Sequence, residues 1–324
     1  MTSIPDGGAG DGGMSSALAG AGPARGAPGD QRPATMKLTP ARPGTSASGT
    51  VRRWRRFARH RGAVAGAAAL ALLAAAAVLA PWIAPHDPQA LAGPPFVSPG
   101  PRFWLGTDNL GRDVLSEILH GARISLAVGV LAAASSTLIG VAMGAVAGFF
   151  GGRADAVLMR TTEFFQIVPR FFLALIIIAL SGPGLAKIIF VIAILGWPAV
   201  ARLVRGEFLR LRTYEFVEAA RAVGASPLLI IVREILPNAI APAVVAGSLD
   251  VAQAILLEAG LSFFGLGDPN HVSWGTMINT AQAFLGEAWW LSTFPGLAIL
   301  LAVLSVNLVG DGLNDALNPR SEQR

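Results

Sequence analysis

The chain has 324 residues, of which 53% are hydrophobic and only 14% are charged, and it contains no cysteine. Because a soluble domain is about 25% charged and several apolar runs here are long enough to cross a bilayer, the composition indicates a polytopic membrane protein. The absence of cysteine excludes disulfides, a thiol nucleophile and Cys-based metal sites, and the net charge of +5 rests on arginines that gather beside the apolar runs, which favours membrane orientation over nucleic-acid binding.

Residues 1–50 are rich in Gly, Ala, Pro, Ser and Thr and have no apolar periodicity, so we predict a disordered cytoplasmic tail. Six arginines within residues 52–61 precede the charge-free run 63–84. A helix over that run would be about 33 Å long, enough to span the hydrocarbon core. Since clustered Arg stays on the cytoplasmic side, the N-terminus is predicted to be cytoplasmic. Residues 51–121 are thus the first transmembrane helix and an external segment.

Five further spans are predicted within the core of the protein, residues 122–320. They are placed at about 122–150, 161–180, 187–205, 239–263 and 292–312. The third is the weakest, because Glu163, Pro169 and Arg170 interrupt its inner end. Either Arg170 snorkels to the cytoplasmic edge, or the third span starts later than residue 161.

In the second span, glycines recur every four residues on one face, a spacing that lets helices approach closely. These are Gly140, Gly144 and Gly148.

The arginine distribution agrees with six spans. The segment 202–238 carries six Arg, 85–121 carries two and 264–291 carries none. The positive-inside rule therefore predicts that both termini and the loop 202–238 are cytoplasmic.

The segment 213–237 predicts two short helices between the fourth and fifth spans. Gly224 suits the C′ position of the first helix, and Ser226 and Pro227 suit the N-cap and N1 positions of the second, which Pro237 is expected to end. Two interpretations remain open. The elbow is either an ordinary amphipathic connector at the membrane surface or a docking element that a soluble partner approaches through a small-residue face.

The residues of this elbow resemble a known motif. Glu218-Ala219-Ala220, then Gly224 after three residues, then Leu236-Pro237 resemble the EAA loop of permease subunits of bacterial ABC importers. Other segments resemble C-type permeases of the dipeptide/oligopeptide/nickel importers, and the likeness covers roughly residues 51–320. These segments are Trp104–Leu115, Gly121–Leu126, Ile255–Gly267, Ser273–Gly275 and Asn307–Pro319.

The resemblance implies an all-α, six-helix ABC type I importer permease fold in the bacterial inner membrane. It implies a second homologous permease as a heterodimer partner, two ATP-binding subunits and an extracytoplasmic substrate-binding protein. The implied cargo is a dipeptide or oligopeptide, and nickel chelates, glutathione and oligosaccharides are alternatives within the family. Within the loop 206–238, the resemblance assigns ATPase coupling to Glu218, Ala219, Ala220 and Gly224.

Motifs for chemistry are missing from the sequence. No Gly is followed directly by Lys, so the phosphate-binding GxxxxGK[ST] loop is absent. We therefore predict that the chain is not an enzyme and holds no cofactor, and that ATP and Mg²⁺ bind partner subunits. The four histidines are isolated, without metal-ligand spacing. An ion-coupled secondary transporter, using Asp250 or Glu258 as a proton site, is the alternative from another class.

The fifth span contains three polar residues, Asp250, Gln253 and Glu258. At 100° per residue they fit within a face about 140° wide. Because charges in mid-membrane are costly, these groups must face protein or water. They either line a translocation path or form hydrogen bonds that fix helix packing.

A second polar group precedes the second span. Asp108, Arg112 and Asp113 are expected at the external face, where the resemblance places the docked binding protein. Alternatively they form a capped turn leading into the helix, with Asp108 or Thr107 as the cap.

Overall fold

The computed structural model describes residues 57–317, in which the regular structure is helical apart from one isolated β-bridge between Thr107 and Asp113. The tail predicted over residues 1–50 lies outside the described residues. The long helices are α2 (Arg61–Ile83), α3 (Val114–Phe150), α6 (Leu185–Leu211), α9 (Leu236–Leu261) and α11 (Trp290–Leu317). The shorter elements are α4 (Gly152–Ile167), α5 (Arg170–Ser181), α7 (Glu215–Ala222), α8 (Pro227–Leu229), π-helical η1 (Ile230–Ile235) and η2 (Ser262–Leu266), α10 (Trp274–Ala281) and the 3₁₀ turn η3 (Gln282–Phe284).

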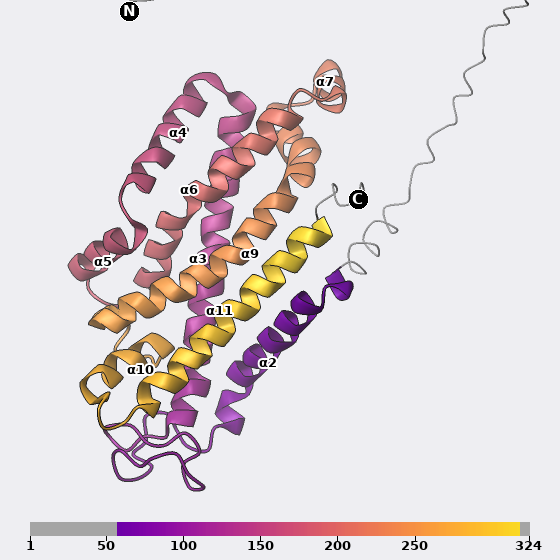
Figure 1. Ribbon diagram of the computed structural model, residues 1–324. Helices are drawn as coiled ribbons and strands as arrows, with labels where there is room; N and C mark the ends of the chain where they lie inside the picture. Colours follow the sequence, from indigo (N-terminus) through magenta and orange to yellow (C-terminus); the bar gives the residue numbers. More distant parts are fainter. Residues whose placement is uncertain (1–56, 318–324) are drawn as a thin grey trace, which may run out of the picture. The chain divides into compact units, whose positions relative to one another are not determined.

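Helix α3 is central to the described part of the chain (Figure 1). It packs most extensively against α6 and then against α9, while α11 packs against α2 and α9. Helix α7 lies at one end of the bundle, and α10 and the long segment between α2 and α3 lie at the other. The two ends therefore carry different candidate sites.

Close packing of α3 against α6 confirms the glycine prediction. A Cβ atom on Gly140 would lie 2.8 Å from the carbonyl oxygen of Trp197, and one on Gly148 would lie 2.8 Å from that of Arg205. A Cβ on Gly144 would collide with the carbonyl of Ala201. The backbones meet so closely that no larger residue fits between them.

Five helices are long and apolar enough to cross a membrane, and the count is six if α4 and α5 form one span. The third span, predicted over 161–180 with an interruption at Pro169 and Arg170, is divided in the structure into α4 and α5. The chain bends by 84° between α4 and α5, because Pro169 lacks an N–H and restricts the residue before it. Arg170 does not snorkel, because its side chain turns toward α6 and α9. It is the first residue of α5, which agrees with the alternative of a later start.

Pro237 does not end a helix, contrary to the sequence prediction. Helices α8, η1, α9 and η2 continue one into the next from Pro227 to Leu266. The Leu236 N–H donates to the carbonyl of Ile231, five residues back, so the turns ahead of Pro237 are wide. This widening accommodates a residue that has no N–H to donate. The second short helix of the elbow is thus the first part of the fifth span.

Candidate functional site

The elbow between α6 and α9 is anchored by one buried side chain and capped as predicted. Val217 of α7 is fully buried in a cluster with Phe208 of α6 and Ile230 of η1. Gly224 follows α7 with a φ of +82°, the left-handed conformation that suits a C′ glycine. The Ser226 hydroxyl accepts from the Leu229 N–H at 3.4 Å, and Pro227 is at N1.

The predicted coupling residues lie on the outer face of this elbow. Glu218, Ala219 and Gly224 are exposed, whereas Ala220 is half-buried against the cluster around Val217. A Cβ placed on Gly224 would meet nothing within 4 Å. Apolar side chains beside them are also exposed, including Val223 at 85%. The elbow thus presents small and apolar groups on a rigid support, an arrangement suited to contact with another protein.

Asp250 in α9 is paired rather than free. Its carboxylate lies 3.7 Å from Arg170 Nη1 and accepts a 3.0 Å hydrogen bond from the Ser136 hydroxyl. Arg170 Nε also donates to the carbonyl of Leu195 at 2.9 Å. This group joins α3, α5, α6 and α9 at the point where the α4–α5 pair bends.

The other two polar residues of α9 have different surroundings. Gln253 is exposed, whereas Glu258 is only 2% exposed. The Glu258 carboxylate accepts hydrogen bonds from three hydroxyls on α3, η2 and the start of α10. Their donors are Ser262 at 2.7 Å, Ser273 at 2.8 Å and Ser125 at 3.3 Å. In the single chain Glu258 is therefore enclosed, whereas Gln253 is exposed and Asp250 is paired with Arg170.

At the opposite end, the segment before α3 forms a capped turn, but with a different cap from the one expected. Asp113 is the N-cap and accepts from the Ser116 N–H at 3.1 Å. Asp108 instead accepts from the Leu110 and Arg112 N–H groups at 2.8 and 2.7 Å. Thr107 bonds to the backbone of Pro94 and Val97. The Asp113 side chain is the cap because Asp108 and Thr107 hold the preceding loop.

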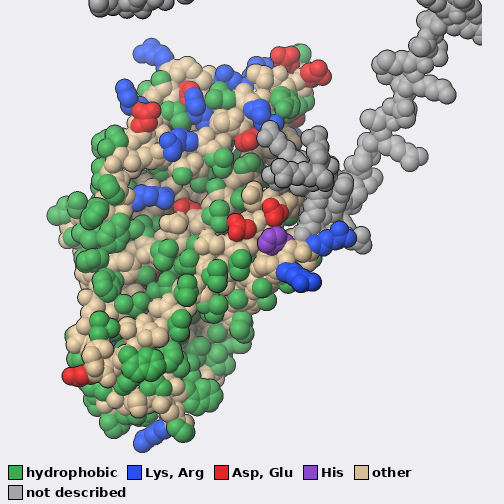
Figure 2. Space-filling model, viewed as in Figure 1, with side chains coloured by type: hydrophobic (Ala, Val, Ile, Leu, Met, Phe, Trp, Pro, Cys, Tyr) green, Lys and Arg blue, Asp and Glu red, His purple; other side chains and the backbone are tan. Residues whose placement is uncertain are grey.

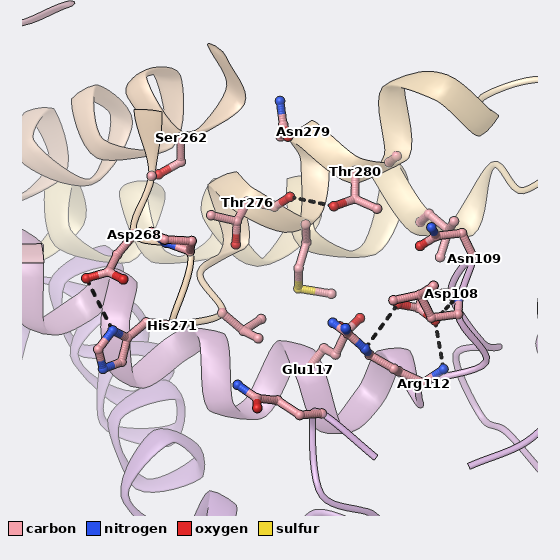
Figure 3. A pocket seen from close by; sticks show the side chains of 18 of the residues that line it. Asp108, Asn109, Arg112, Glu117, Ser262, Asp268, His271, Thr276, Asn279 and Thr280 are labelled. Carbon is pink, nitrogen blue, oxygen red and sulfur yellow. Dashed lines mark hydrogen bonds and ion pairs between the residues drawn. The ribbon is translucent and has the colours of Figure 1, made fainter. Parts of the chain in front are cut away.

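A cavity of about 560 Å³ opens beside this turn, between the start of α3, the loop after η2 and helix α10. Figure 3 shows Asp108, Arg112 and Glu117 grouped on one side, with Asp268 and His271 apart from them. Burial raises the pKa of Asp268, but hydrogen bonds from the Asn270 and Leu185 N–H groups, and from His271, outweigh it and leave that pKa below its ordinary value. Asp268 therefore contributes a negative charge to the cavity wall.

Sequence reasoning missed two groups at this site and in the bundle. Glu117 was not singled out because one acidic residue in a helix of this length has no distinguishing pattern. The partnership of Arg170 with Asp250 joins residues 80 positions apart, for which the only sequence signal was that both charges interrupt apolar runs. Within residues 57–317, no group of three or more His, Asp and Glu could hold a metal ion.

Two family profiles match the chain. The profile of the binding-protein-dependent transport system inner membrane component matches residues 140–323. The profile of the N-terminal TM domain of oligopeptide transport permease C matches residues 50–99.

Curated relatives are similar over most of their length. A di/tripeptide transport system permease of Pseudomonas aeruginosa is 41% identical over 82% of this chain and 91% of that protein. A dipeptide transport system permease of Bacillus subtilis is 41% identical over 82% of this chain and 84% of that protein. A glutathione transport system permease of Pectobacterium atrosepticum is 41% identical over 82% and 90%.

Among solved structures, a chain of the MetNI methionine ABC transporter in an inward-facing conformation is similar. Its TM-score is 0.52 at 19% identity, over 62% of this chain and 95% of that one. At that identity the likeness concerns the fold alone.

Proposed function

Because this chain belongs to the family of binding-protein-dependent transport system inner membrane components, we propose that it is the permease subunit of an ATP-driven importer of short peptides. The observation that carries this proposal is an exposed elbow with the EAA pattern in a chain that is 41% identical to peptide permeases. The chain forms half of the path and pairs with a second, homologous permease. It is a transport subunit and makes or breaks no covalent bond.

In this proposal the elbow end faces the cytoplasm, together with both termini. Figure 2 shows Lys and Arg side chains gathered at that end on the face viewed, above a broad hydrophobic surface. Because positive charge is retained on the cytoplasmic side, this distribution supports the orientation. The long loop before α3 and helix α10 then face outward, where a substrate-binding protein delivers its cargo.

Coupling to ATP is assigned to a different polypeptide. The sequence has no phosphate-binding loop, so ATP and Mg²⁺ belong to two partner ATPase subunits. Glu218, Ala219, Ala220 and Gly224 dock there. When the ATPases close, the rigid elbow transmits the movement directly to α6 and α9, because Val217 is buried between them.

Movement of these helices would alternately open the path to each side, and the polar residues of α9 are proposed to respond. Asp250 is half-shielded and Gln253 is exposed in the single chain, so both are available to a path formed with the second permease. Glu258 is enclosed by serines, and its proposed contribution to the path is to hold α3, α9 and α10 in place.

Co-purification tests the coupling role. Replacing Glu218 with Ala, or Gly224 with Val, should reduce the ATPase subunits recovered with the permeases and lower ATP-dependent peptide uptake in proteoliposomes. Glu163→Gln removes an exposed charge whose one ionic partner among residues 57–317 is Arg160, and it should change neither the recovery of the ATPases nor the uptake. Equal recovery of the ATPases with all three variants would contradict the coupling role. Uptake by the permeases without nucleotide, abolished by an uncoupler, would instead favour the ion-coupled transporter.

Orientation has its own test, which uses the absence of native cysteine. Val223→Cys places a thiol on the elbow, and Leu91→Cys places one on the loop before α3; the native side chains are 85% and 73% exposed. An impermeant maleimide applied to intact spheroplasts should label the second variant alone. Labelling of Val223→Cys from outside would contradict the proposed orientation.

Glutathione is a second candidate cargo, because a glutathione permease is as similar as the peptide permeases. Competition decides between them. Excess dialanine should suppress uptake of a labelled dipeptide by the complete importer, and excess glutathione should not. The reverse result would assign glutathione as the cargo.

A further inference from the structure

We infer that the cavity beside α10 binds the amino-terminal end of a short peptide, holding its ammonium group against Glu117. This inference rests on the proposed function and names a subsite for the cargo within the chain itself. The cavity has a volume of about 560 Å³, within the range of about 300–1,000 Å³ that is common for small-molecule sites. It lies at the end of the bundle opposite the elbow, where cargo is delivered.

Glu117 is a buried carboxylate without a matching donor. Glu117 is only 6% exposed, and its one ionic contact within the described part of the chain is Arg112 Nη1 at 3.7 Å. That separation is longer than a hydrogen bond, and no hydrogen bond to this carboxylate is formed by residues 57–317. A buried carboxylate normally accepts several hydrogen bonds. Its free capacity is therefore available to a ligand that enters the cavity.

The charge of the cavity wall favours a cation. Asp108, Glu117 and Asp268 bring three carboxyl groups, and they face one guanidinium, that of Arg112, and the imidazole of His271. A cation beside Glu117 favours the ionised form of that buried group. Asp108 and Asp268 already accept from backbone N–H groups, whereas Glu117 does not. An ammonium group, with three donors and one charge, is the complement of Glu117.

Arg112, beside Glu117, also has an unsatisfied hydrogen-bond donor, which makes the cavity complementary to a peptide and not only to an amine. Arg112 Nε is buried without a hydrogen bond, 3.9 Å from Asp108 Oδ2. In the first residue of a peptide, a carbonyl oxygen lies close to the ammonium group. The ammonium would pair with Glu117, and that carbonyl would accept from the guanidinium of Arg112, whose side chain is 30% exposed and lines the cavity beside Glu117. Figure 3 shows these two side chains side by side.

Direct binding tests this inference on the complete assembly of permeases and ATPases without the binding protein. In isothermal titration, dialanine should bind saturably, and N-acetyl-dialanine should bind about ten- to a hundredfold more weakly, the value of one charge-assisted hydrogen bond. Glu117→Gln should weaken the binding of dialanine by the same factor and leave the binding of N-acetyl-dialanine unchanged. Glu287→Gln removes an exposed external charge outside the cavity wall and should have no effect.

A second pair of variants keeps Glu117 in place. Thr280 is exposed and lines the cavity, so replacement there should not impair folding. Thr280→Lys supplies a tethered ammonium and should abolish dialanine binding, whereas Thr280→Gln, of similar size without the charge, should retain it.

Three outcomes would overturn the inference. The first is equal affinity of the assembly for dialanine and N-acetyl-dialanine. The second is an unchanged affinity for dialanine after Glu117→Gln, in an assembly that elutes intact. The third is that Glu117→Gln changes only the affinity of the assembly for the binding protein and not its affinity for dialanine. The last would show that a lysine of the binding protein occupies the cavity. Peptide uptake by the wild-type importer is measured in parallel. Uptake without a dialanine-binding cavity would refute this inference alone, whereas absence of uptake would refute the proposed cargo.

Discussion

The α3–α6 contact and the elbow after α6 both depend on glycine, for opposite physical reasons. At the contact, a Cβ on Gly144 would collide with the carbonyl of Ala201, so the glycine is needed for space. At the elbow, Gly224 has open space around it and is needed for its φ of +82°. The comparison teaches that the packed interior fixes the positions of helices, whereas the exposed elbow fixes only a backbone direction. Substitutions in the two regions should therefore have different effects.

The largest effect is expected at the helix contact. Gly144→Val would force α3 and α6 apart and should destabilise the permease by about 1–3 kcal/mol or more, the cost of overpacking. The measurement is the apparent melting temperature of the detergent-solubilised assembly. Gly206→Ala is the matched control on α6, because a Cβ there meets nothing within 4 Å. If both variants lowered the melting temperature by a similar amount, the distinction between packed and open glycines would be wrong.

The next effect is expected at the serine-bound carboxylate. Glu258→Leu leaves three buried hydroxyls without their acceptor and should cost about 1–3 kcal/mol. Glu258→Gln retains an acceptor oxygen and should lose less stability than Glu258→Leu. Thermal unfolding of the purified assembly measures both. If Glu258→Leu were as stable as wild type but inactive in transport, Glu258 would line the path rather than hold the helices.

A smaller change in stability is expected at the elbow. Gly224→Ala should cost about 1–2 kcal/mol, because the left-handed conformation is unfavourable for a residue with a Cβ, and Gly224→Asn should cost less. Melting temperature and peptide-stimulated ATPase activity are measured together. Both variants should remain folded, and peptide should stimulate the ATPase activity less in Gly224→Ala than in Gly224→Asn. Stability unchanged by Ala would contradict the φ requirement.

The smallest effect concerns Asp268, which belongs to neither region and fastens the start of α6 through the Leu185 N–H at 2.9 Å. Since its pKa is lowered on folding, the ionised form stabilises the structure. That contribution is fully present above the ordinary value of 3.8 and is lost as the pH falls through the lowered pKa. The difference in melting temperature between wild type and Asp268→Asn should thus be constant from pH 5 to 8 and shrink below about pH 4. A difference that grew at acid pH would contradict the lowered pKa.

Local chemistry was sufficient to predict much of the fold. Apolar run length located α2, α3, α6, α9 and α11, because the hydrophobic thickness of a bilayer is fixed. The four-residue repeat of glycines identified the contact face of α3. Gly224, Ser226 and Pro227 marked the elbow, because caps are set by the conformation of single residues.

Patterns were insufficient wherever a neighbouring helix decided the outcome. Pro237 ends a helix by local rules, but the π-helical turns of η1 carry the chain past it. Snorkelling was one of two explanations for Arg170, but its partner is Asp250 of α9, which lies 80 positions away in the chain. Thr107 and Asp108 bond to the backbone of the loop before α3, so Asp113 is the residue left to cap the helix. Which residue caps α3 was therefore decided by the fold of that loop.

The sequence by itself determined that this protein spans the membrane, which end carries the positive charge and where the elbow turns. These properties depend on hydrophobicity, charge and backbone preference, each of which acts within one segment. Only the tertiary structure decided that Asp250 is paired, that Glu258 is enclosed by serines and that Glu117 faces a cavity without a donor. Whether a polar side chain is satisfied depends on atoms that lie far away in the chain, which only the packing of the helices brings together.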